Sequence, residues 1–212
     1  MQGTRRSSEV RQAELIDAAL HIIATDGIAA LSTRSLAERV GLSSGALFRH
    51  FASLDVLLAA VVTRVATVLE GTYPPAGLAP HARLLQFIEA RSHAVGQQVG
   101  IFRLVVSEQF SLALPPAAAA TLAGCVQKSQ AFVLACLREG QLAGEFRADL
   151  PTAALAVVVM GTIQMLALNA SAGRIMTSTA SADLVRTSLM MLLTPDVPPA
   201  SATQSKRKRS KV

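Results

Sequence analysis

The sequence at residues 31–51 is LSTRSLAERVGLSSGALFRHF, and it predicts two short helices joined by a few residues around Gly41. The first helix is expected over 35–40, and Ser43 is placed to cap a second helix that continues to the end of the stretch. Such a tight joint holds two helices at a steep angle. We therefore predict a helix-turn-helix that is packed against a preceding helix by Leu36, Ala37, Val40, Leu42 and Leu47.

The residues expected on the outer face of the second helix are small or polar at its start and basic or aromatic toward its end. Small side chains let a helix backbone approach base edges in the major groove of DNA, and basic side chains bind phosphates. Arg34 is the best candidate for a bidentate contact to guanine, and Ala46 would touch a thymine methyl group. The pattern predicts binding to double-stranded DNA through Thr33, Arg34, Ser43, Ser44, Gly45, Ala46, Phe48, Arg49 and His50.

The net charge of the chain gives little support for DNA binding. The chain has 20 Lys and Arg against 14 Asp and Glu, a formal charge of +6. Five of the basic residues lie between Lys206 and Lys211, so the rest of the chain is nearly neutral. A DNA-binding function must therefore rest on where individual arginines lie.

The helix-turn-helix lies near the N-terminus of a chain that we expect to be helical throughout. A helix is predicted over 10–26, and a longer helix capped by Ser53 ends before a Pro- and Gly-containing loop at 73–77. Further helices are expected over 81–97, 101–112, 116–142, 152–170 and 181–194, with Gly100 between two of them. We predict an all-α fold with an N-terminal three-helix domain over 1–52, a second helical domain over 53–194 and a disordered basic tail over 195–212.

The segment from Arg11 to about Leu58 resembles the DNA-binding domain of the TetR/AcrR family of bacterial regulators. The order of residues in 33–51, followed by the pair Leu57-Leu58, carries the similarity, which covers about a quarter of the chain. This resemblance implies a transcriptional regulator, most simply a dimeric repressor that a small-molecule ligand releases from a palindromic operator. It also implies that the 53–194 domain binds the ligand and forms the dimer.

Two positions depart from the family's pattern. Family members usually carry Tyr where this chain has Phe48, and Lys or Arg where it has Leu54, and in the family both groups tend to hold phosphates. We suggest that Arg5, Arg6 and the basic run at 206–211 partly replace these contacts. The alternative is that the run is only a charged tail; deleting it without effect on DNA affinity or its salt dependence would favour that alternative.

The second domain offers candidates for a dimer interface and a ligand pocket. The helices over 152–170 and 181–194 are too apolar to face water, so we expect them to pair with those of a second chain in a four-helix interface. Ligand contacts are sought among polar or adaptable residues in apolar helices, although Met and Phe at helical spacing more often belong to the core. The candidates are Phe102, Arg103, Phe110, Met160, Gln164, Met165 and Asn169.

Other functions have weaker support in the sequence. No paired carboxylates, nucleophile–base motif or phosphate-binding loop suggests an enzyme, and Glu89 with His93 lacks a further metal ligand at suitable spacing, so we expect neither catalysis nor a cofactor or metal. The polar, basic residues 1–11 and the interrupted apolar stretch 153–168 predict a cytoplasmic protein without a membrane span. An activator, and a ligand-binding or scaffold protein whose helix-turn-helix has lost DNA binding, remain open alternatives.

Overall fold

The computed structural model describes residues 8–172 and 179–195, and all regular secondary structure within them is helical. The predicted all-α fold is confirmed. Arg5, Arg6 and the predicted tail after Pro195 lie outside the described residues. The elements are α1 (Ser8–Asp26), the 3-10 helix η1 (Ile28–Ala30), α2 (Thr33–Val40), α3 (Ser44–Leu47), α4 (Leu54–Glu70), α5 (Pro80–Gly96), α6 (Val99–Val106), α7 (Glu108–Ala113), α8 (Pro116–Ala143), α9 (Thr152–Ala172) and α10 (Thr179–Leu193).

Local hydrogen bonds set the bounds of the short N-terminal helices. Ser32 caps α2, because its hydroxyl accepts the N–H of Ser35 at 3.1 Å while the Ser35 hydroxyl accepts the N–H of Ser32 at 3.0 Å. The helix ends at Gly41, whose φ of 66° lies in the left-handed region that favours glycine. Ser43 caps α3 and Ser53 caps α4, as their positions in the sequence predicted.

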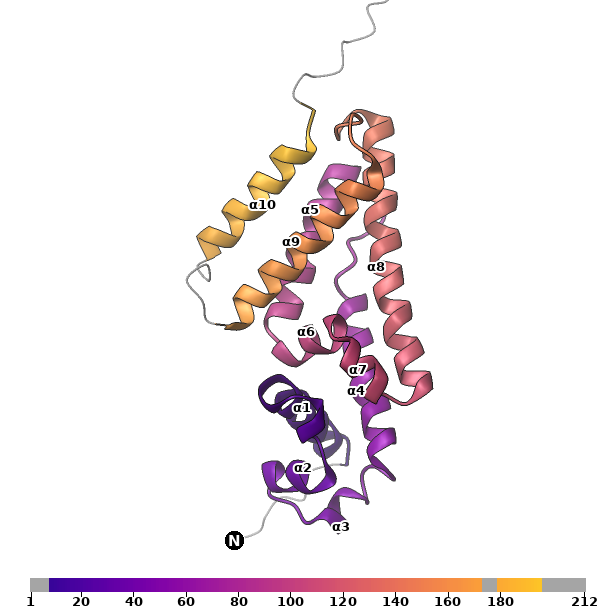
Figure 1. Cartoon of the computed structure of the whole chain (residues 1–212), viewed down its shortest axis with the longest axis vertical. Helices are drawn as coiled ribbons and strands as arrows, with labels where there is room; N and C mark the ends of the chain where they lie inside the picture. Colours follow the sequence, from indigo (N-terminus) through magenta and orange to yellow (C-terminus); the bar gives the residue numbers. More distant parts are fainter. Residues whose placement is uncertain (1–7, 173–178, 196–212) are drawn as a thin grey trace, which may run out of the picture.

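Two hydrophobic cores organise the chain. One joins α1, α2, α3 and α4 to α6 and α7, and it also includes residues of α5, α8 and α9. The other lies among α5, α8, α9 and α10. Figure 1 shows α1, α2 and α3 at one end of the molecule, the long helices α5, α8 and α9 extending from it, and α10 alongside α9. The hydrophobic core of the N-terminal helices is thus continuous with side chains of the second domain.

The structure differs most from the predicted helices at three places. The helix expected over 101–112 is broken at Ser107 into α6 and α7. Gly100 lies inside α6, because the absence of a side chain lets its backbone approach Leu20 of α1. The second helix of the helix-turn-helix ends at Leu47, and residues 48–50 form a turn instead.

The apolar helices α8 and α9 are long enough to span a membrane by length and composition. The most apolar 18-residue windows within Pro116–Ala143 and Thr152–Ala170 have mean hydropathies of 1.2 and 1.8. Both helices nevertheless pack along α5, and side chains such as Val133 and Val159 are fully buried there. Two helices that pass this test by length and composition are weak evidence for a membrane span.

Candidate DNA interface and ligand cavity

Helix α3 is a single turn that depends on its anchors to the core. Leu47 is fully buried and Phe51 nearly so, and both belong to the core formed with α1 and α4. At the other end, the Ser43 hydroxyl accepts the N–H of Ala46 at 3.2 Å. The Gln12 side chain of α1 donates to the carbonyl oxygen of His50 at 3.0 Å, a contact that the sequence analysis did not identify. These contacts hold a helix too short to be stable by itself.

Most of the predicted DNA-contacting residues lie on the outer surface of this unit. The exposed residues are Ser43, Ser44, Gly45, Phe48 and Arg49, together with Arg34 on α2, whereas Thr33 and His50 are half-buried.

The prediction that Ala46 faces outward was wrong. Only 8% of this residue is exposed, because both residues at the end of the single turn, Ala46 and Leu47, face the protein. Its methyl group is therefore shielded from a thymine in this conformation.

The exposed guanidinium of Arg34 is already paired. Its Nε donates to Glu38 Oε1 at 2.9 Å, and the Arg34 and Glu38 side chains are 87% and 65% exposed. This hydrogen bond raises the pKa of Arg34. Because both groups lie in solvent, the pair is weak, and a base or phosphate can compete with Glu38 for the guanidinium.

A cavity of about 110 Å³ lies in the second domain, with walls from α4, α5, α6, α8 and α9. Three of the predicted ligand contacts, Phe102, Met160 and Gln164, line it. The remaining four candidates lie elsewhere. Phe110 is buried in the core shared with α1, and Arg103 is directed toward α1, where its Nη1 lies 3.5 Å from the carbonyl oxygen of Ile23. Met165 is exposed and Asn169 half-buried, and both lie outside the cavity lining.

Arg91 of α5 is the polar residue that the sequence analysis missed. It is only 6% exposed and lines the cavity. Its Nε donates to Thr72 Oγ1 at 2.7 Å, its Nη1 to Ser129 Oγ at 3.0 Å and its Nη2 to the carbonyl oxygen of Leu69 at 3.1 Å. All three acceptors are neutral. Burial lowers the pKa of Arg91, although arginine keeps its positive charge in proteins.

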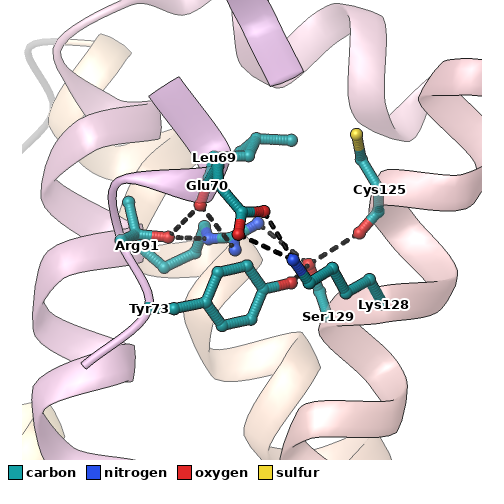
Figure 2. Close-up of polar contacts among 8 residues, drawn as sticks. Leu69, Glu70, Tyr73, Arg91, Cys125, Lys128 and Ser129 are labelled. Atoms are coloured by element: carbon teal, nitrogen blue, oxygen red, sulfur yellow. Dashed lines mark hydrogen bonds and ion pairs between the residues drawn. The ribbon is translucent and has the colours of Figure 1, made fainter. Parts of the chain in front are cut away.

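The surroundings of Arg91 combine aromatic rings with a second polar layer. Its guanidinium carbon lies 4.8 Å from the ring centre of Phe87 and 5.3 Å from that of Tyr73. Figure 2 shows Glu70 and Lys128 beside these groups, and both carboxylate oxygens of Glu70 accept from Lys128 Nζ at 2.7 Å. The Tyr73 hydroxyl lies 3.3 Å from Ser129 Oγ. The acidic side chain in this cluster is therefore bonded to a lysine.

Comparison with known proteins identifies the N-terminal domain. Residues 15–61 match the model of the family described as bacterial regulatory proteins, tetR family. The N-terminal domain of this chain is therefore similar to the DNA-binding domains of that family. Over 57 residues it is 40% identical to the HTH-type transcriptional regulator BetI of Paraburkholderia phytofirmans. That alignment covers 27% of this chain and 29% of the relative's length.

Solved structures extend this similarity to the whole fold. The ketosteroid transcriptional regulator KstR2 of Mycobacterium tuberculosis aligns with a TM-score of 0.68 at 20% identity, covering 88% of this chain and 96% of its own. PfmR, a TetR family transcriptional regulator from Thermus thermophilus, aligns with a TM-score of 0.65 at 22% identity, with coverages of 84% and 96%. AibR in complex with isovaleryl coenzyme A and operator DNA gives a TM-score of 0.71 at 13% identity, with coverages of 87% and 98%. The TetR-type architecture thus includes the helices around the cavity.

Proposed function

We propose that the protein is a cytoplasmic, dimeric, sequence-specific DNA-binding repressor that a small-molecule ligand releases from a palindromic operator. The observation that carries this proposal is the exposed surface of α3, whose outward residues are small. Leu47 and Phe51 hold this segment to the core, and the exposed Arg34 lies on the preceding helix. Small residues at the start of such a helix let its backbone enter the major groove, while Arg49 reaches phosphates. AibR, which has the same fold, is recorded with both a ligand and operator DNA, and this supports the pairing of the two activities.

Apolar side chains on α9 and α10 support dimerisation. On α9, Val157, Val158 and Met165 are exposed, and on α10 the same holds for Leu184, Met191 and Leu192. Figure 1 places the two helices side by side, so their exposed apolar side chains can form one surface. Two copies of this surface related by a twofold axis would bury it, and the same axis would present two α3 helices to a palindrome.

The cavity is placed to control DNA binding through two helices. Leu69, near the end of α4, lines it, and α4 leads back to the helix-turn-helix. Phe102 and Val105 of α6 also line it, and α6 packs against α1. A ligand that binds one arrangement of α4 and α6 more tightly than another would shift the DNA-binding domains between two poses.

The direct test is a selection from random duplex DNA with the full-length protein. We expect enrichment of a palindrome whose half-sites lie about 10 base pairs apart or a multiple of that spacing. Enrichment of no motif would overturn the proposal and favour a binding protein that has lost DNA recognition. A footprint that overlaps the promoter of the regulated gene agrees with repression, and one confined to the region upstream contradicts it.

Arg34→Ala is expected to weaken binding to the selected operator about 10- to 100-fold and to relax the base preference at one position of each half-site. Glu38→Gln is the matched variant, because it removes the carboxylate that competes for Arg34. We expect it to tighten binding, by less than about tenfold because the ion pair is exposed. Fluorescence anisotropy with a panel of operator variants measures both effects. Equal weakening on every sequence after Arg34→Ala would show that Arg34 contacts phosphate and reads no base.

Met191→Glu is expected to convert the dimer to a monomer, because it places a charge on the exposed apolar surface proposed as the interface while leaving the folded monomer intact. Met191 is 70% exposed, so the change has no cost inside one chain. Analytical ultracentrifugation measures the assembly state. Leu142→Glu on α8, at a residue that is 85% exposed, is the control and should remain dimeric. A Met191→Glu variant that stays dimeric would exclude this surface as the interface.

A further inference from the structure

Among the residues that the structure describes, no carboxylate is hydrogen-bonded to the buried guanidinium of Arg91. Its three hydrogen bonds go to two hydroxyls and one carbonyl oxygen, and Glu70 is bonded through both oxygens to Lys128. Burying an unpaired charge is costly, and the rings of Phe87 and Tyr73 offset only part of that cost. A charged group that lines a cavity and whose burial costs folding free energy is a candidate for ligand recognition.

The hydrogen-bond partners of the guanidinium among the described residues are neutral groups. Arginine carries five N–H bonds, and three of them are used by Thr72, Ser129 and Leu69. The Tyr73 hydroxyl also interacts with the guanidinium, and like the other three partners it is neutral. A carboxylate accepts two hydrogen bonds from a guanidinium and neutralises its charge, so it is a stronger partner for Arg91 than any of these neutral groups.

The rest of the cavity sets the size and polarity of the ligand. Its volume is about 110 Å³, and much of its wall is apolar, including Val95, Phe102, Val105 and Ile163. Dry apolar cavities of about 150 Å³ hold one benzene molecule, so this cavity suits about four to six non-hydrogen atoms. Gln130 and Gln164 are exposed residues of the lining and mark the side open to solvent.

We propose that the cavity binds a small monocarboxylate with a short apolar chain, whose carboxylate pairs with Arg91. The ligand's chain lies against the apolar wall, and its carboxylate gives Arg91 a directly hydrogen-bonded counter-ion. The regulatory consequence rests on the proposed function, because it requires that DNA binding responds to this site.

Arg91 connects the ligand to the carboxyl end of α4. Its Nη2 binds the carbonyl oxygen of Leu69, its Nε binds Thr72 Oγ1, and the Thr72 hydroxyl donates to the same Leu69 carbonyl oxygen at 2.6 Å. A carboxylate competes with these neutral acceptors for the guanidinium, because hydrogen bonds between charged groups are the stronger ones. Ligand binding thereby weakens the hold of Arg91 on the helix that leads to the DNA-binding domain.

Isothermal titration calorimetry on the full-length protein tests the proposal with butyrate, butyramide and butylamine as probes of equal chain length. We expect butyrate to bind at least about tenfold more tightly than either of the others, and Arg91→Met to remove that preference. Equal binding of butyrate and butyramide, no binding of butyrate, or unchanged butyrate binding by Arg91→Met would each overturn the proposal. Inorganic phosphate, an anion without an apolar chain, tests whether the apolar wall contributes to binding. If phosphate bound more tightly than butyrate, the proposal of a short apolar chain would be overturned.

Two further variants separate recognition from folding. Arg103→Met makes the same substitution at an arginine outside the cavity lining, and it should leave butyrate binding unchanged. Met160→Trp fills the cavity without altering the bonds of Arg91, so loss of butyrate binding there supports the site even if Arg91→Met fails to fold; retained binding overturns it.

The carboxylate proposal and the DNA proposal fail separately. Operator binding without butyrate binding overturns only the former, and butyrate binding by a protein that selects no DNA motif overturns only the latter.

Discussion

Leu47→Ala is expected to abolish operator binding and to lower the free energy of unfolding by about 2–5 kcal/mol. Leu47 is fully buried in the core that joins α1 to α4, so its truncation leaves a cavity there. The effect on DNA binding is larger than the loss of stability suggests. Helix α3 has four residues, too few to remain helical without tertiary contacts, and Leu47 is its main anchor.

Chemical denaturation measures the stability loss, and fluorescence anisotropy on the selected operator measures the loss of binding. Leu142→Ala is the matched control, since Leu142 lies on α8 and is 85% exposed. The same substitution there should change the free energy of unfolding by less than about 0.5 kcal/mol and leave operator binding intact. If Leu47→Ala retained full operator affinity, α3 would not be the recognition element.

The parts of the DNA-binding domain that could be predicted are those fixed by neighbouring residues. Ser43 and Ser53 cap the helices that follow them, and Gly41 adopts the left-handed conformation that ends α2, because each of these features needs only a few residues of sequence. The orientation of Ala46 could not be predicted in the same way. The prediction assumed a helix continuing to Phe51, whereas the single turn of α3 ends with Ala46 and Leu47 both facing inward.

The cavity was harder to predict because five helices build it. Arg91 and Arg103 both lie in largely apolar helices, yet only Arg91 is enclosed, by Tyr73, Thr72 and Ser129 from other segments. One signal in the sequence was available. Arg91 continues the buried stripe of α5 at helical spacing, between Ile88 and Val95.

Gly100 has a different structural role from the one that its sequence predicts. In the sequence it predicts a break between helices, whereas in the structure it allows α6 to approach α1. A Cβ atom at this position would lie 2.4 Å from the carbonyl oxygen of Leu20 and 3.0 Å from its carbonyl carbon. These are backbone atoms of α1 and cannot rotate away, so any side chain at this position must push the two helices apart.

Gly100→Ala is therefore expected to lower the free energy of unfolding by about 1–3 kcal/mol through overpacking. We also expect weaker operator binding, although Gly100 lies far along the chain from the helix-turn-helix. The reason is that α6 carries Phe102 and Val105 of the cavity wall on the same short helix that contacts α1, so displacing it changes the pose of the DNA-binding domain. Denaturation and operator anisotropy, each with and without the ligand, measure both effects.

Gly124→Ala supplies the control, because Gly124 lies on the exposed surface of α8 and a Cβ atom there meets nothing within 4 Å. Replacing glycine inside a helix without a clash should raise the free energy of unfolding by about 0.4–1 kcal/mol, since alanine restricts the unfolded chain. The two alanine substitutions thus have opposite expected signs. If Gly100→Ala behaved like Gly124→Ala and kept full operator affinity, the close contact between α6 and α1 would not couple the cavity to the DNA-binding domain, and the route through α4 and Arg91 would have to carry the response alone.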